Sequence, residues 1–278
     1  MPDKPIKKIG MIAGYGAFPL EMAQALKDKA YEVHVVAACE ETSPEIESLV
    51  TSVCWLHVGK LGAMIKSFQA SGVSQVVMAG KVQKLHLFRN FRPDFVAVKA
   101  LLSLKDRRDD SIMLKITQLL ADAGIEVVSQ VGLATQMLAE EGLLFGRKSS
   151  KQEISDMKFG SMHACAIAAM DIGQTVIVQQ GAVLAVEAIE GTDEAIRRGG
   201  SLGNGKAVVV KVAKPNQDLR FDVPAIGPDT LKVMHEAGCS ALAVEAGCTL
   251  LIGRHDLANL AKEYNICVYG MKVEGSGH

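Results

Sequence analysis

The stretch KIGMIAGYGAFPLEMAQAL, residues 8–26, decides the class of fold. An apolar run over Lys8–Ala13 predicts a short buried strand, the glycine turn Gly14–Pro19 follows, and apolar residues then recur at helical spacing over Leu20–Leu26. Strand, turn and helix in succession begin a unit in which helices connect parallel strands. The turn lets a ligand approach the backbone and points helix N–H groups at an anion, so Gly14 and Gly16 are candidate ligand-binding residues.

The same alternation continues along the first half of the chain and predicts a parallel sheet wound by right-handed crossovers. We therefore predict a Rossmann-like amino-terminal domain over residues 1–132. Its further strands are expected at 32–37, 52–56, 75–79 and 126–131, and its helices at 45–49, 60–70 and about 112–120. Ligands of such sheets bind at the carboxyl ends of the strands, where Lys81 follows strand 75–79 and could meet an anion.

A second α/β domain with a mixed sheet is predicted over residues 133–278, with a linker at about 145–151. The strand-like segments 175–179 and 182–188 flank Gln180-Gly181, a two-residue turn typical of a β-hairpin. Thr192 predicts the start of a helix that Gly199 ends. Further helices are expected within 133–144 and at 152–171, 228–237 and 255–263, and further strands at 207–212, 241–244, 250–252 and 267–269.

Composition excludes several classes of protein. The chain of 278 residues is 49% hydrophobic and 22% charged, which is typical of a globular protein, and its formal net charge of −1 provides no general attraction to nucleic acid. Six cysteines occur without a C-x-x-C pair, so we expect reduced thiols rather than disulfides or a zinc site. Neither a secretory leader nor eighteen consecutive apolar residues is present, and we expect a cytoplasmic protein.

A charged loop follows the apolar run Ala207–Val212. Residues 214–230 contain three prolines and four charged side chains of interest: Lys214, Asp218, Arg220 and Asp222. Carboxylate oxygens suit Mg²⁺ or Mn²⁺, while lysine and arginine suit phosphate oxygens, so the loop is typical of a metal or phosphate site. The alternative is a surface loop whose charges pair with one another.

Two more carboxylates leave buried strands in the second half. Glu187 ends the strand-like segment 182–188, and Glu245 follows the segment 241–244. We hypothesise that these two residues converge with Asp218 and Asp222 on one site. Asp193 is a weaker candidate, because an acidic residue suits the first turn of a helix.

Residues 86–93 are basic and apolar, which suits either a cover for an amphipathic phosphorylated ligand or a packed connection between helices. Asp109 and Asp110 stand just before the apolar series of the helix at 112–120. Their plainest role is to cap that helix.

Four motifs together resemble one known family. They are Ile12–Pro19, Asp109-Asp110, Val186–Asp193 and Lys214–Gly227, and they resemble the UDP-2,3-diacylglucosamine pyrophosphatase family of lipid A biosynthesis, the form distinct from the calcineurin-like enzyme. The resemblance implies a two-domain cytoplasmic homodimer that uses Mg²⁺ or Mn²⁺. It also implies hydrolysis of UDP-2,3-diacylglucosamine to UMP and 2,3-diacylglucosamine 1-phosphate (lipid X), with attack on the phosphorus nearer the sugar.

The resemblance also assigns roles to residues. An aspartate of the motif Gln-Asp-x-Arg-x-Asp is essential in the family, which here means Asp218 or Asp222, and we favour Asp222 while keeping both. We predict Asp222, Asp218 and Glu187 as catalytic residues, and Asp218, Asp222 and Glu245 as metal ligands. The predicted substrate-binding residues are Gly14, Gly16, Lys81, Asp109, Asp110, Thr192, Asp193, Lys214, Gln217 and Arg220, of which Lys214 and Arg220 would contact the diphosphate.

The acyl chains of such a substrate need an apolar cleft, because each exposed CH₂ costs about 0.8 kcal/mol. We expect this cleft between the domains, and a transient contact with the inner-membrane surface. Two other functions stay open. A nicotinamide-dependent oxidoreductase would need Glu40 as its ribose-binding acid, although the glycine turn lacks the third glycine of the dinucleotide fingerprint. A nucleotide-sugar-binding regulator without catalysis would use the carboxylates only in salt bridges.

Overall fold

The structure is a computed structural model of the chain, and it describes residues 7–83, 91–104, 109–215 and 217–273, without the side chains of residues 109 and 110. The chain divides into two compact units. Unit 1 comprises Met1–Ala134 with Leu219–Phe221, and unit 2 comprises Thr135–Asp218 with Asp222–His278. None of the helices in the described residues is both long and apolar enough to cross a membrane.

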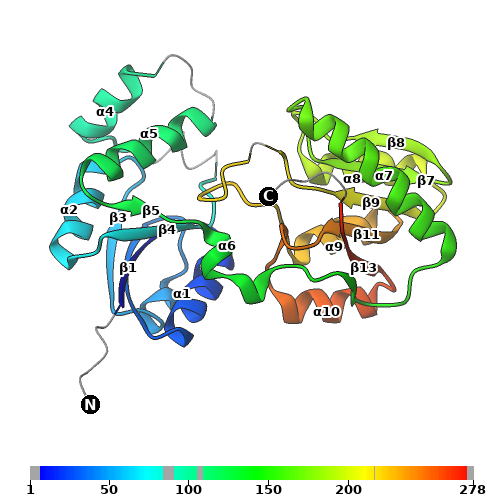
Figure 1. The fold of residues 1–278 in the computed structure, drawn as a ribbon, viewed down its shortest axis with the longest axis horizontal. Coiled ribbons are helices and arrows are strands. Elements are labelled where there is room, and N and C mark those ends of the chain that lie inside the picture. Colours follow the sequence, from blue (N-terminus) through cyan, green and yellow to red (C-terminus); the bar gives the residue numbers. More distant parts are fainter. Residues whose placement is uncertain (1–6, 84–90, 105–108, 216, 274–278) are drawn as a thin grey trace. The chain divides into compact units, whose positions relative to one another are not determined.

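Unit 1 contains the predicted parallel sheet, with five strands in the order β3-β2-β1-β4-β5 (Figure 1). All of its pairings are parallel, which confirms the Rossmann-like prediction. The strands are β1 (Lys7–Ala13), β2 (Tyr31–Ala38), β3 (Ser52–Leu56), β4 (Gln75–Ala79) and β5 (Glu126–Val127). The helices are α1 (Phe18–Asp28), η1 (Pro44–Ser48), α2 (Leu61–Ser71), α4 (Phe95–Leu102), α5 (Asp109–Asp122) and α6 (Gln130–Leu133).

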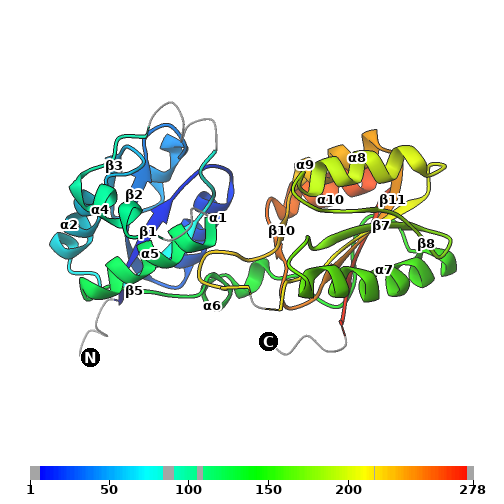
Figure 2. The same cartoon turned by 90° about the horizontal axis from the view of Figure 1, so that it is seen from above.

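Helices cover both faces of this sheet, as a parallel sheet requires (Figures 1 and 2). Phe68 of α2 and Leu120 of α5 share a buried cluster with Val36 and Val76 of the strands. Helix α1 packs through its apolar stripe on β2 and β4.

Two predictions around residue 130 are wrong. The strand expected at 126–131 ends at Val127, because the Ser129 hydroxyl accepts a hydrogen bond from Val131 N and starts α6. The helix expected within 133–144 is replaced by the short helix η2 (Thr135–Met137) and the strand β6 (Gly142–Phe145). Glycine at 142 adopts a φ of 104°, which begins β6 and which other residues disfavour.

A segment from the second half of the chain completes unit 1. Leu219 O accepts hydrogen bonds from Gln130 N at 3.1 Å and from Ser129 Oγ at 3.2 Å. The Phe221 ring packs against the apolar cluster beneath α2 and α5. The tip of the charged loop therefore belongs to unit 1, while Asp218 and Asp222 on either side of it belong to unit 2.

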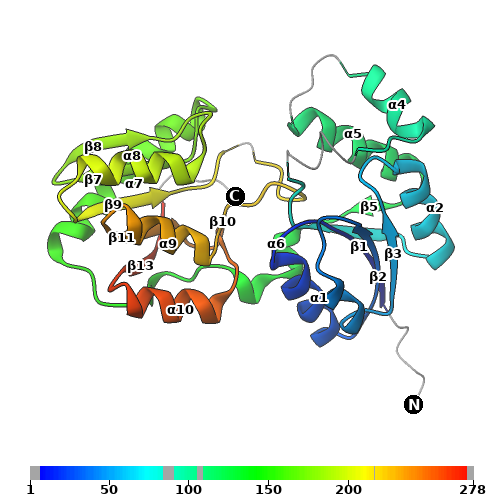
Figure 3. The same ribbon diagram turned by 180° about the vertical axis from the view of Figure 1, so that it is seen from behind.

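Unit 2 contains a six-stranded mixed sheet in the order β6-β13-β11-β9-β7-β8, which confirms the predicted mixed sheet (Figure 3). Its inner strands β9, β11 and β13 are parallel, and the others pair antiparallel. The strands are β7 (Thr175–Gln179), β8 (Ala182–Val186), β9 (Ala207–Lys211), β11 (Cys239–Glu245) and β13 (Cys267–Met271), with a separate parallel pair β10 (Ala225–Ile226) and β12 (Leu250–Leu251).

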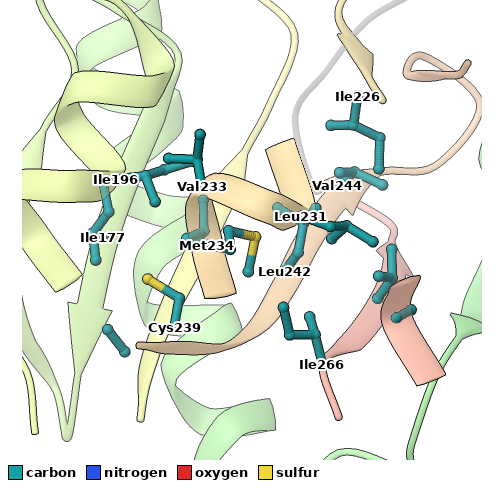
Figure 4. Packing of buried hydrophobic residues seen from close by; sticks show 14 of the residues in the cluster. Ile177, Ile196, Ile226, Leu231, Val233, Met234, Cys239, Leu242, Val244 and Ile266 are labelled. Atoms are coloured by element: carbon teal, nitrogen blue, oxygen red, sulfur yellow. The ribbon is translucent and has the colours of Figure 1, made fainter. Parts of the chain in front are cut away.

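Four helices cover the two faces of this sheet (Figures 2 and 3). Helix α7 (Lys151–Ala169) covers one face, and α8 (Thr192–Leu202), α9 (Pro228–Glu236) and α10 (Arg254–Glu263) cover the other. Figure 4 shows the core between the sheet and helices α8, α9 and α10, in which Ile196 of α8 and Met234 of α9 pack over the strands. Valines along β9 alternate between the two cores, since neighbouring strand residues point to opposite faces.

The predicted hairpin is present, with φ of 50° at Gln180 and 75° at Gly181, as its tight turn requires. The predicted stop of α8 at Gly199 is wrong, because the helix continues to Leu202. Gly199 serves close packing instead: a Cβ there would lie 2.6 Å from Ile177 Cβ. All six cysteines are free thiols, as expected.

Candidate active site

The end of β9 brings a lysine into the interior of unit 2. All five residues of β9 are buried, and the last of them is Lys211, which is 9% exposed. Its ammonium Nζ donates a hydrogen bond to Ala225 O at 3.1 Å. Burial lowers the pKa of Lys211 below its ordinary value, and the nearby carboxylates of Glu187, Asp193 and Asp222 oppose that shift.

Glu187 is held in place from two sides. Its Oε1 accepts a hydrogen bond from Thr192 Oγ1 at 2.8 Å, and its Oε2 accepts one from Gln174 N at 3.3 Å. Glu187 directly follows β8 and is 8% exposed. Its backbone N donates a hydrogen bond to Thr175 O at 2.9 Å. Thr192 therefore orients a predicted catalytic carboxylate as well as beginning α8.

The charged loop supplies Asp222, another carboxylate that acts on the lysine. Asp222 N donates to Asp218 O at 2.9 Å, which folds the predicted motif back on itself. Lys214 N donates to Gln217 Oε1 at 3.1 Å, and Lys214 Nζ lies 2.7 Å from Asp171 Oδ1. Lys214 thus forms an ion pair with the exposed Asp171, a residue that was not among the predicted site residues.

Glu245 lies apart from this group. Val244 pairs in register with Lys211 and belongs to the core of the α8 side, so the next residue, Glu245, points to the α7 side. Its Oε2 accepts a hydrogen bond from Ala213 N at 2.8 Å. Burial and the Glu245 carboxylate raise the pKa of Cys165 on α7 and raise that of Cys248 to about 11. Of the four carboxylates expected to converge, Glu187 and Asp222 act on Lys211, and Glu245 points to the other face of the sheet. Asp218 is joined to Asp222 by the backbone bond from Asp222 N to Asp218 O.

The donor set bears directly on the predicted metal. Within the described residues, no three histidine, cysteine, aspartate or glutamate side chains form a group that could hold a metal ion by themselves. The charged groups at the end of β9 are the Lys211 ammonium and the carboxylates of Glu187, Asp193 and Asp222 that act on it. A divalent cation would therefore need further ligands, such as the oxygens of substrate phosphates, because Mg²⁺ typically takes only one or two protein carboxylates.

The glycine turn of unit 1 is fastened to the end of β4. Gly14 N donates to Ala79 O at 2.8 Å, and Tyr15 and Lys81 exchange backbone hydrogen bonds at 2.6 and 3.2 Å. A Cβ at position 14 would lie 2.6 Å from Lys81 O, so glycine is required there. The Lys81 ammonium lies over the Tyr15 ring, 5.9 Å from its centre.

An open hollow of about 480 Å³ lies beside this turn, at the carboxyl ends of β1 and β2. Its lining includes Tyr15, Gly16 and Glu40. His57 Nδ1 lies 2.9 Å from Glu40 Oε1, so the acid that a nicotinamide cofactor would need is engaged by a histidine. Residues 84–90, which cover most of the basic and apolar segment, lie outside the described residues, as do the side chains of Asp109 and Asp110.

Sequence reasoning missed Lys211. The signal was present: a lysine directly follows three valines in a strand that is otherwise apolar. A lysine at that position can be exposed at the strand end or buried inside the fold, and the sequence alone does not distinguish these two cases.

Comparisons with known proteins cover both units. A model of the LpxI N-terminal domain matches residues 8–137, and one of the LpxI C-terminal domain matches residues 140–269. The UDP-2,3-diacylglucosamine pyrophosphatase LpxI of Caulobacter vibrioides is 29% identical over an alignment of 277 positions that covers 96% of this chain and 98% of that protein.

Solved structures resemble the chain only weakly. The Bordetella bronchiseptica enzyme WbmG, in complex with NAD and UDP, is 15% identical with a TM-score of 0.30, over 45% of this chain and 37% of its own. The biotin carboxylase domain of Hydrogenobacter thermophilus 2-oxoglutarate carboxylase is 11% identical with a TM-score of 0.28, over 64% and 36%. These scores support no conclusion about function. The two domain matches, which together span nearly the whole chain, show that this protein belongs to the LpxI family.

Proposed function

We propose that this chain hydrolyses the pyrophosphate bond of UDP-2,3-diacylglucosamine, giving UMP and 2,3-diacylglucosamine 1-phosphate in lipid A biosynthesis. Membership of the LpxI family and the name of the Caulobacter relative support this substrate. The observation that carries the proposal is the end of β9, where the buried Lys211 lies within the electrostatic influence of the carboxylates of Glu187, Asp193 and Asp222.

The group suits the chemistry of the reaction. Water attacks the phosphorus nearer the sugar, a P–O bond forms, and the P–O bond to the UMP leaving group breaks. The attacking water must lose a proton, and we assign that proton to the Asp222 carboxylate, with Asp218 as the neighbouring alternative. Negative charge that develops on the phosphoryl oxygens needs cations near it, which is usually the largest part of catalysis in phosphoryl transfer.

We further propose that Mg²⁺ or Mn²⁺ assists, held by Asp222 and Asp218 together with the substrate diphosphate. Such an ion would supply neutralisation of the phosphoryl charge. Glu245, which lies on the α7 side of the sheet, is a less suitable ligand in this arrangement than Asp218. The same proposal includes two properties that rest on the family resemblance. The protein acts as a homodimer in the cytoplasm, and it makes a transient contact with the inner-membrane surface to reach its lipid substrate.

Release of UMP from UDP-2,3-diacylglucosamine in the presence of Mg²⁺ tests the proposal. We expect Asp222→Asn to reduce turnover by at least about 10²-fold, while Asp229→Asn, a matched change at an exposed aspartate paired with Lys232, leaves it unchanged. EDTA should abolish turnover, and added Mg²⁺ or Mn²⁺ should restore it. In ¹⁸O water, the label should enter the sugar phosphate rather than UMP. No UMP above a boiled control would refute the activity.

A further inference from the structure

Lys211 and Ala225 stand at the two ends of one loop. Strand β9 ends at Lys211, β10 begins at Ala225, and residues 212–224 between them carry the predicted site motif. The hydrogen bond from Lys211 Nζ to Ala225 O, at 3.1 Å, therefore joins the base of that loop.

The backbone around Ala225 leaves its carbonyl group for this lysine. Pro224 O accepts from Leu250 N at 2.8 Å, and Ile226 O accepts from Ile252 N at 2.9 Å. These bonds use one edge of β10, and the carbonyl of Ala225 points to the other edge because successive carbonyls alternate along a strand. The carboxyl-terminal end of the loop is thus held between β12 and the side chain of Lys211.

Burial of the Lys211 ammonium costs free energy. Its transfer from water is unfavourable unless opposite charges and hydrogen bonds compensate it. Among the described residues, the ammonium has one hydrogen-bond acceptor, Ala225 O, and its other compensation is the field of three carboxylates, one of them Asp222. The bond to Ala225 O therefore fixes the buried ammonium to the end of the loop at which β10 begins.

We propose that Lys211 is a positioning residue that clasps the base of the 212–224 loop and thereby keeps Asp222, near the end of that loop, in its place at the site. The role that this gives to Asp222 rests on the proposed function, whereas the clasp itself does not. Since Lys211 is buried and bonded to the backbone, it acts through the loop rather than by contact with the substrate. Small displacements of a reacting group cost about 10²-fold in rate, so the clasp should appear in kcat rather than in KM.

Two measurements test this in the full-length chain. Lys211→Met should lower kcat for UMP release by about 10²-fold with little change in KM. The same variant should be cut by trypsin after Arg220, within the loop, about tenfold faster, because cleavage follows the population of the opened loop. Lys206→Met is the matched control, since Lys206 is exposed and directly precedes β9. It should match the wild type in both measurements.

The outcomes separate the two proposals. A wild-type protein without UMP release refutes the proposed function, but a faster cut after Arg220 in Lys211→Met would still support the clasp. An active wild type with an unchanged Lys211→Met, or with a loss of kcat and no faster cleavage, overturns the inference. If Lys211→Met does not fold, Lys211→Gln decides. It replaces the ammonium by a neutral and shorter donor and so weakens the clasp; reduced kcat with faster cleavage after Arg220 supports the proposal, and wild-type kcat or unchanged cleavage overturns it.

Discussion

Glu153 provides a pH-dependent contribution to stability in the acidic range. This residue of α7 is 7% exposed, and its carboxylate accepts hydrogen bonds from Arg147 Nη1 at 2.9 Å and Nη2 at 2.5 Å. Ser150 N donates to it at 2.8 Å and Ser240 Oγ at 2.7 Å. Burial alone would raise the pKa of Glu153, but these donors lower it from 4.5 to about 2.

The stability that follows has a definite size and sign. A difference between 4.5 and about 2, at about 1.4 kcal/mol per pKa unit, corresponds to about 3 kcal/mol of unfolding free energy. Because the pKa is lower in the folded state, this stabilisation is complete above pH 4.5 and is lost as the pH falls toward 2. Glu153→Gln removes the charge and leaves the Arg147 guanidinium without its carboxylate.

We therefore expect Glu153→Gln to destabilise unit 2 by about 3 kcal/mol at pH 7, and by less than about half of that at pH 3. Urea unfolding, followed by amide hydrogen exchange in β9 and β11, measures the loss in the inner strands of unit 2. Glu263→Gln, at an exposed position of α10, is the control and should change stability by less than about 0.5 kcal/mol. An equal loss at pH 7 and pH 3, or a loss below about 1 kcal/mol at both, would contradict the reasoning.

Two further predictions concern unit 2. Thr192→Val removes the hydroxyl that donates to Glu187 Oε1, and we expect a loss of about 1–2 kcal/mol in stability together with about tenfold lower kcat. Thr192→Ser keeps the donor, and equal melting temperatures and rates for the two variants would disprove this role. Gly199→Ala should destabilise by about 1–3 kcal/mol in thermal unfolding, since its Cβ would lie 2.6 Å from Ile177 Cβ. Ser201→Ala, on the exposed side of the same helix, is the control and should be neutral or stabilising. A stabilising Gly199→Ala would contradict the prediction, because the core would then accommodate the added methyl group.

Local patterns were sufficient for most of the fold. The parallel sheet of unit 1 followed from apolar runs that alternate with helical spacing, because burial of a strand and of a helix face leaves a periodic signal in the sequence. The hairpin at Gln180-Gly181 followed from turn chemistry. Strand β6 did not follow, since its pairing partner β13 lies more than a hundred residues further along the chain.

The candidate site was predicted in part. The sequence placed Glu187 and Asp222 at ends of buried strands, and both act on Lys211 in the structure. It could not separate Glu245 from them, because the face on which a residue lies depends on the register between strands, and β9 and β11 pair with an irregularity between Cys239 and Ala241.

By itself, the sequence determined the α/β class, the mixed second sheet and the family to which the chain belongs, since these depend on periodicity and on contiguous motifs. Only the tertiary structure decided that Leu219–Phe221 completes unit 1, that Glu245 points toward α7, and that a buried lysine joins the ends of the loop carrying Asp222. Those features depend on strand register and on contacts between distant segments, which bring together residues that no local pattern links.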